Sequence, residues 1–224
     1  MPGAKYCATF ATVLVVCLLL GALLSAQTPA PNPRDIQLVG DRFKPLKYDE
    51  MTPTQKTMMD HLVSGERRGA GGPFNVLLRS PEMGDLVQQF GASMRFHSSL
   101  PRKLNEMAII ITARQWMAQY EWNAHRTAAA QAGLNEAIIK SIASGKRPES
   151  MDSDETAVYN FGTELLNTHQ VSDAVFKTAK DKFGERGVVD LISVMGYYQL
   201  VSMLLNVDRY PLPAGAKPEL QPLK

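Results

Sequence analysis

The chain has 224 residues, a formal net charge of +2 and two cysteines, Cys7 and Cys17. This length suits one or two domains, and a near-neutral charge without a Lys/Arg cluster excludes a phosphate-binding patch, so we expect no nucleic-acid partner. Both cysteines lie in the N-terminal segment described next, so the rest of the chain can form no disulfide and no thiol or thiolate site.

Residues 1–26 have the pattern of a secretory signal peptide. Lys5 is the only charged residue, the run from Val13 to Leu24 is nearly all aliphatic, and the small residues Ser25 and Ala26 close it. Such a segment directs export, so we expect a periplasmic or secreted protein. The alternative is an uncleaved N-terminal anchor, since about 20 apolar residues can span a bilayer; only then would a membrane be a partner.

The rest of the chain divides into three parts. Residues 27–50 are rich in proline and polar side chains and predict a linker or an arm over the surface. Residues 51–210 predict a helical domain, and residues 211–224, again rich in proline, predict an extended tail.

Helical spacing of apolar residues, with N-cap residues and glycine or proline stops, predicts the elements of the domain. In chain order, helices are expected over 52–63, 75–78, 81–96, from 101 onward, 118–132, 135–144, 152–168, 172–183 and 187–206. No stretch alternates with the period of two that marks a strand, so we predict an all-α fold. The helix over 187–206 is strongly apolar, which is typical of a buried helix or one between subunits.

The stretch 120-YEWNAHRTAAAQAGL-134 holds the first candidate site residues. Glu121 and His125 are four residues apart and share one helix face, and Tyr120 and Trp122 flank that face with aromatic bulk. An imidazole beside a carboxylate can transfer a proton near neutral pH. The alternative is an ordinary surface Glu–His pair on an alanine-rich helix.

Glu106 is the second candidate, because it lies inside the apolar stretch 104-LNEMAIIITA-113. A carboxylate beside a core must find a partner or be neutralised, unless it lies on the wet face of its helix. Along one unbroken helix it would lie about 28 Å from His125. The two can meet only through a break, which we place at Trp116–Ala118, or across subunits. No histidine has the spacing to another His, Asp or Glu that is typical of metal ligands, so we expect no metal site.

These residues resemble a known family. The run 101-PRKLNEMAIIITARQWMAQYEWNAHRTAAAQAGL-134 is similar to the core of the carboxymuconolactone decarboxylase family, which shares its fold with the alkylhydroperoxidase D-like proteins. Residues 158–206 are similar to the family's C-terminal half, so the resemblance covers roughly residues 50–210. It implies an alkylhydroperoxidase D-like helical domain that forms homo-oligomers, trimers or hexamers, with active sites near subunit contacts.

The chain departs from the peroxidase branch of this fold. In that branch a Glu, a Cys-x-x-Cys pair and a His form a proton relay. Glu106 and His125 match the Glu and the His, but Ala118 and Glu121 stand where the cysteines fall. The resemblance is therefore to the branch that lacks the cysteine pair, and peroxidase-like antioxidant activity is disfavoured.

The resemblance implies a cofactor-free lyase that removes carbon dioxide from a small carboxylic acid or lactone. His125 would donate a proton to the resulting dienolate, Glu106 would orient it, and Glu121 would act as a second base. The substrate-binding residues would be Tyr120, Trp122, His97 and Tyr198. Export argues against muconolactone itself, whose breakdown is cytoplasmic, so a lactone isomerisation, a dehydration, or decarboxylation of another small carboxylic acid stays open. The alternative is a non-enzymatic exported binding protein for a small apolar acid.

Overall fold

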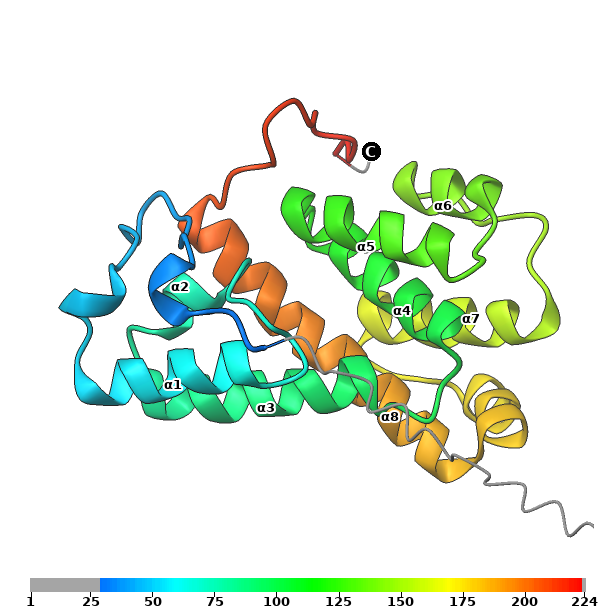
Figure 1. Ribbon diagram of the computed structural model, residues 1–224. Coiled ribbons are helices and arrows are strands. Elements are labelled where there is room, and N and C mark those ends of the chain that lie inside the picture. The colour runs from blue at the N-terminus through cyan, green and yellow to red at the C-terminus, as the bar shows by residue number, and fades with distance from the viewer. Residues whose placement is uncertain (1–28, 223–224) are drawn as a thin grey trace, which may run out of the picture.

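The computed structural model describes residues 29–222 and is all-helical (Figure 1). No strand occurs in this part of the chain, so the all-α prediction is confirmed. The predicted signal peptide lies outside the described residues. The helices are α1 (Pro53–Ser64), α2 (Phe74–Leu77), α3 (Pro81–Phe96), α4 (Arg102–Gln115), α5 (Gln119–Gln131), α6 (Glu136–Ala143), α7 (Ser153–Thr168) and α8 (Asp173–Asp208).

The helix starts follow the capping chemistry of the sequence. Thr52 and Asp152 each form a capping box, with Gln55 and Glu155 respectively, and these boxes satisfy backbone N–H groups that a helix start leaves free. One prediction needs correction. Pro101 was expected inside the first turn, but it is the cap itself, and α4 begins at Arg102.

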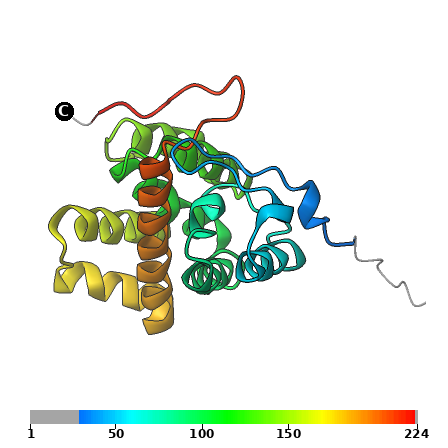
Figure 2. The ribbon, with the colours of Figure 1, turned by 90° about the vertical axis from the view of Figure 1, so that its left-hand side faces the viewer.

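The two helices predicted over 172–183 and 187–206 are joined in α8, which breaks at Gly184. Gly184 has φ 68° and ψ 176°, a conformation that is essentially restricted to glycine. Figure 2 shows the consequence, since the first part of α8 (gold) runs across the direction of the long second part (orange).

α4 lies at the centre of the larger hydrophobic core. It buries residues on every side, and it packs against α5, α7 and α8. Burial on every side places α4 in the interior of the fold, even though the buried residues include the polar Glu106 and Arg114. α8 passes between α1 and α3 on one side and the group α4–α7 on the other (Figure 1). A smaller cluster, which includes Met58, Leu62 and Leu78, fills the space under α1 and α2.

Within the described residues, α8 is the one helix long and apolar enough to cross a membrane by length and composition alone. Half of its most apolar window is buried inside the protein, and the core helix of a folded domain has the same properties.

Both terminal segments are held against the helices. The Asp208 carboxylate, fully buried at the end of α8, accepts hydrogen bonds from the backbone N–H groups of Asp41 (3.2 Å) and Phe43 (2.8 Å) in the N-terminal arm. The C-terminal tail buries Leu220, whose carbonyl accepts from the Gln119 amide at 2.8 Å. Figure 1 shows this tail (red) beside the start of α5.

Candidate functional site

A sharp break between α4 and α5 brings the predicted site residues together. α4 ends at Gln115 and α5 begins at Gln119, and Met117 between them has a left-handed φ of 51°. The Ala118 N–H donates to the carbonyl of Ala113 at 2.9 Å, which closes the turn. α5 therefore packs back on α4. The predicted break at Trp116–Ala118 is confirmed, although no glycine or proline marks it.

This turn places His125 between two carboxylates. Its Nδ1 lies 2.7 Å from Glu106 Oε2, and its Nε2 lies 3.0 Å from Glu121 Oε1. The three residues are buried, with exposed fractions of 3% for Glu106, 4% for Glu121 and 6% for His125. The alternative of a solvated Glu–His pair on a helix surface is therefore wrong.

The charge state of His125 follows from these contacts. Burial alone would lower the pKa of the imidazole, because the charged form loses its hydration. The negative charges of Glu121 and Glu106 and their hydrogen bonds outweigh this effect and raise the pKa to about 9. At neutral pH the ring is therefore an imidazolium, with one N–H donated to each carboxylate.

His125 and Glu121 line a cavity of about 130 Å³. An engineered cavity of roughly 150 Å³ in another protein holds a benzene molecule, so this slightly smaller space suits the reacting end of a small compound. Other lining side chains are those of Arg67, Arg95, Tyr120, Tyr197, Tyr198 and Val201. The small residues Ala124 and Ala128 also line it, where the alanine-rich face of α5 leaves room.

Tyrosines form the walls of this cavity. The Tyr198 ring meets the His125 ring edge-on, with centroids 4.8 Å apart. Burial raises the pKa of Tyr198 well above its usual value and that of Tyr120 to about 12, so both are neutral phenols. Gly91 allows α3 to approach α8 here, because a Cβ on it would lie 2.1 Å from the Tyr197 ring.

Two arginines complete the cavity. Arg67 comes from the loop after α1, and its Nη2 donates to the Tyr197 hydroxyl at 3.3 Å. Arg95 comes from the last turn of α3. Neither has a carboxylate within salt-bridge distance among residues 29–222. Neither arginine was predicted. For Arg67, the paired arginines in the glycine-rich stretch 65-GERRGAGGPF-74 were a usable signal, whereas nothing in the sequence marks Arg95.

Glu106 also borders a second cavity, of about 390 Å³, which it shares with Arg95, Arg102 and Asn105. Its Oε2 bonds His125, whereas its Oε1 accepts no hydrogen bond from any described residue. Arg95 lines both cavities. The Glu106–His125–Glu121 row therefore runs from one cavity to the other.

Two residues predicted to line the substrate pocket lie elsewhere. Trp122 is about 100° round the helix from Glu121, and its Nε1–H donates to Glu219 of the tail at 3.0 Å. His97 caps the end of α3, is exposed, and pairs with Glu66 at 2.6 Å. Neither lines the His125 cavity, whereas the predicted Tyr120 and Tyr198 do.

No cluster of three or more His, Cys, Asp or Glu residues in the described part of the chain is arranged to hold a metal ion. Glu106 and Glu121 bind opposite nitrogens of one ring, so the three side chains do not converge on a common point.

No protein-family model matches the chain, and no curated protein matches it. Solved structures do. An uncharacterised peroxidase-related protein from Silicibacter sp. TM1040 is 16% identical, with a TM-score of 0.55 over 62% of this chain and 76% of that one. A protein of unknown function from Agrobacterium tumefaciens, described as a putative antioxidant defence protein AhpD, is 16% identical, with a TM-score of 0.53 over 64% of this chain and 99% of that one. The fold is alkylhydroperoxidase D-like.

At this identity the likeness establishes the fold, and the chemistry must be argued from the residues of this chain. Within residues 29–222 the chain has no cysteine, so the described residues around His125 include no thiol. Oxygen and nitrogen groups supply all of the acid/base capacity of these residues.

Proposed function

We propose that the protein is a cofactor-free acid/base catalyst that acts on a small carboxylic acid or lactone, with decarboxylation as the first reaction to test. The observation that carries the proposal is the His125 imidazole held between two buried carboxylates at the wall of a cavity. Perturbed titratable groups that meet in a cleft favour a catalytic role over a structural one.

The geometry changes the role that the sequence indicated for His125. Both ring nitrogens are engaged, so the imidazole has no free N–H to offer to a substrate. Glu121 lines the cavity and bonds Nε2, so it is the group that exchanges the proton with the substrate. Glu106 holds Nδ1 and fixes the orientation of the ring, as a positioning residue does.

The proposed step balances as follows. The substrate loses carbon dioxide, and the electron pair of the broken C–C bond stays on the substrate as a dienolate. The proton on His125 Nε2 passes to the Glu121 carboxylate, and Glu121 delivers it to the dienolate carbon. Neutral His125 then recovers a proton from solvent. General acid–base catalysis of this kind typically contributes about 10²- to 10⁴-fold in rate.

Arg67 and Arg95 supply the complementary charge. Neither is neutralised by a described acid, so each can attract an anionic group that enters the cavity. Guanidinium donors stabilise developing negative charge, and here the partly buried Arg67 should do so more strongly than the exposed Arg95, which water screens. In this proposal they hold the dienolate oxygen or a second substrate carboxylate, while the reacting carbon faces Glu121.

The experiment is a release assay for carbon dioxide with carboxymuconolactone and small β-keto acids, run in D₂O to record deuterium at the product carbon. Glu121→Gln should lower turnover by about 10²-fold or more. The exposed Glu82, in the first turn of α3, provides the matched control Glu82→Gln, which should keep full activity. Full turnover by Glu121→Gln, or no release above the buffer rate from any of these acids, would refute the proposal.

Two other outcomes assign the site differently. A small acid that co-purifies with the protein and is returned unchanged would identify a binding protein. Peroxide consumption above that of a heat-killed sample would identify a peroxidase, and it would have to proceed without a thiol from the described residues.

A further inference from the structure

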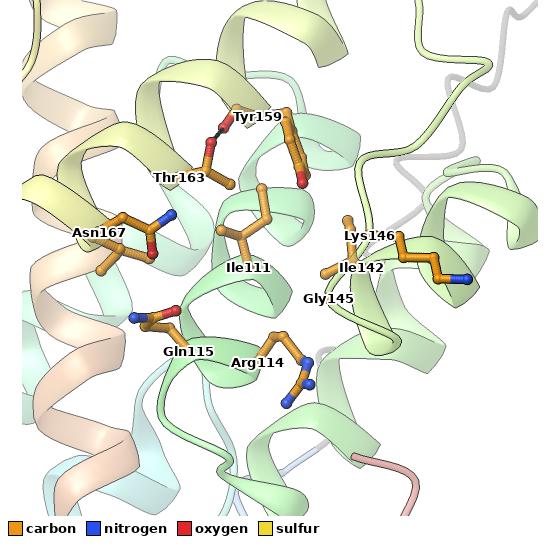
Figure 3. Close-up of a pocket in the computed structure, with 10 residues that line it drawn as sticks. Ile111, Arg114, Gln115, Ile142, Gly145, Lys146, Tyr159, Thr163 and Asn167 are labelled. Atoms are coloured by element: carbon orange, nitrogen blue, oxygen red, sulfur yellow. Dashed lines mark hydrogen bonds between the residues drawn. The ribbon is translucent and has the colours of Figure 1, made fainter. Parts of the chain in front are cut away.

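A separate cavity of about 240 Å³ lies between α4, α6 and α7 (Figure 3). It shares no lining residue with the two cavities beside Glu106 and His125. Figure 3 shows Ile111 near its middle, with Arg114 and Gln115 on one side and Tyr159 and Thr163 on the other. The cavity is therefore polar at both ends and apolar between them.

Arg114 brings an unneutralised positive charge to one end. The residue is only 5% exposed, and its guanidinium donates to the Gln221 carbonyl at 2.8 Å and to the Met117 sulfur at 2.7 Å. Its Nε has no partner. Burial lowers the pKa of Arg114, and no neighbouring acid offsets that effect. Arginine stays charged even so, and a buried charge is costly until an opposite charge meets it.

The rest of the lining is rich in polar groups and holds no acid. The side-chain amides of Gln115 and Asn167 and the Tyr159 hydroxyl make no hydrogen bond within residues 29–222. Burial raises the pKa of Tyr159, which keeps its hydroxyl a neutral donor. Lys146 stands at the rim, and its ammonium extends away from the cavity in Figure 3, where a flexible stem can turn it back over an anion.

We propose that this cavity binds a small organic carboxylate. The carboxylate lies toward Arg114 and Gln115, the apolar body packs on Ile111, Ile142 and Leu166, and a second polar group meets Tyr159 and Asn167. The space exceeds the roughly 150 Å³ that accommodates benzene elsewhere, which leaves room for one ring with a substituent at each end. The site is independent of the chemistry proposed at His125.

The test measures binding of the probe 4-hydroxybenzoate to the full chain by calorimetric titration. Arg114→Gln should weaken binding by about tenfold or more, and Tyr159→Phe by a smaller factor, as expected for bonds to charged and neutral partners. The uncharged analogue 4-hydroxybenzamide should bind at least about tenfold more weakly than the acid. Arg67→Gln, at the His125 cavity, should leave the affinity unchanged.

Gln119→Ala is the matched control for the tail. Gln119 holds the tail through Leu220 and Glu219, and it does not line this cavity. The variant should bind the probe as the wild type does, which separates loss of the Arg114 charge from release of the tail. If Arg114→Gln fails to fold, Tyr159→Phe and Lys146→Gln carry the test.

Four results would overturn the proposal. The first is that the wild type does not bind the probe at about 10 mM, and the second is that Arg114→Gln and Tyr159→Phe both bind it as the wild type does. The third is that 4-hydroxybenzamide binds as tightly as 4-hydroxybenzoate. The fourth is that Arg67→Gln, and not Arg114→Gln, loses binding. The last result would move the probe to the His125 cavity without deciding whether that cavity is catalytic.

Discussion

His125 shows how local charge reverses the usual effect of burial on a histidine. Removal from water disfavours an imidazolium, yet the carboxylates of Glu106 and Glu121 more than compensate, and the pKa rises to about 9. The pair of contacts also fixes the ring, because each nitrogen has its own acceptor.

The stability of the protein should therefore depend on pH through His125. Its folded pKa, about 9, lies above the unfolded value of 6.5. The stabilising effect is fully present below pH 6.5 and is lost as the pH rises through 9, a change of about 3 kcal/mol. Urea unfolding at pH 6.5 and 9.5 should show this loss in the wild type and in His97→Gln, but not in His125→Gln. An NMR titration midpoint for His125 at or below its ordinary value would contradict it.

Glu106→Gln tests the contact with Nδ1 alone. The amide keeps the size of the side chain and removes one negative charge, so the His125 midpoint in an NMR titration should fall by about one unit or more. Glu155→Gln is the matched control, since Glu155 is a buried acid on α7 that pairs with Lys103. It should leave the midpoint where it is; an equal shift in both variants would point to a general loss of packing.

Sequence reasoning reached Glu106, Glu121 and His125 because helical spacing and a family resemblance both single them out. It missed Arg67 and Arg95 because a loop and a helix end place them, and no periodic pattern describes either. Trp122 was misplaced for a simple reason. Adjacent residues on a helix point in directions about 100° apart, so a neighbour of Glu121 faces a different part of the fold.

At the scale of elements, two breaks determine how the helices meet. The break at Met117 folds α5 back on α4, and the break at Gly184 turns the chain into the long part of α8. The sequence indicated the break in α8, because Gly184 and the polar residues around it interrupt the helical pattern. The break at Met117 was predicted only from the need for Glu106 to reach His125, because methionine rarely adopts a left-handed conformation.

Substitutions at two glycines of α8 should have opposite effects. A Cβ on Gly184 or on Gly196 would meet no atom within 4 Å, so space is not the issue at either site. Gly184→Ala should destabilise the protein by about 1–3 kcal/mol because its φ of 68° strains alanine. Gly196→Ala should stabilise it by up to about 1 kcal/mol, as alanine does within a helix. Urea unfolding midpoints measure both changes in stability. If both substitutions stabilise or both destabilise the protein, backbone conformation is not the cause.

At the scale of the whole molecule, the chain ends are part of the packed structure. The all-α fold could be predicted because each long helix carries an apolar stripe of its own. The position of the tail could not, because one buried leucine and a few polar contacts hold it. Such contacts have no periodic signature, and the sequence indicated only an extended segment. The predicted trimer or hexamer stays a prediction.

Leu220→Ala should release the tail without unfolding the helices. Leu220 is 2% exposed, and a buried leucine cut to alanine typically loses about 2–5 kcal/mol. The other contacts of the tail are polar, namely hydrogen bonds with Gln119, Arg114 and Trp122 and an ion pair between Glu219 and Arg126. Each such contact typically contributes only about 0.5–1.5 kcal/mol, less than the buried leucine. In a Trp116→Phe background, where Trp122 is the remaining tryptophan, fluorescence should shift to longer wavelength as Glu219 leaves the indole. The exposed-site variant Lys217→Ala should show no shift, and an unshifted Leu220→Ala would mean that the tail stays docked.

The glutamate at position 121 has a consequence for how such a centre is maintained. A thiol-based relay is spent each time it is oxidised, and a separate reductant must restore it. The row of Glu106, His125 and Glu121 exchanges only protons, and it borders a cavity at each end. Proton exchange with water restores its starting protonation state after every cycle. Under the proposed function the protein therefore needs no recycling partner and keeps its activity in oxidising surroundings.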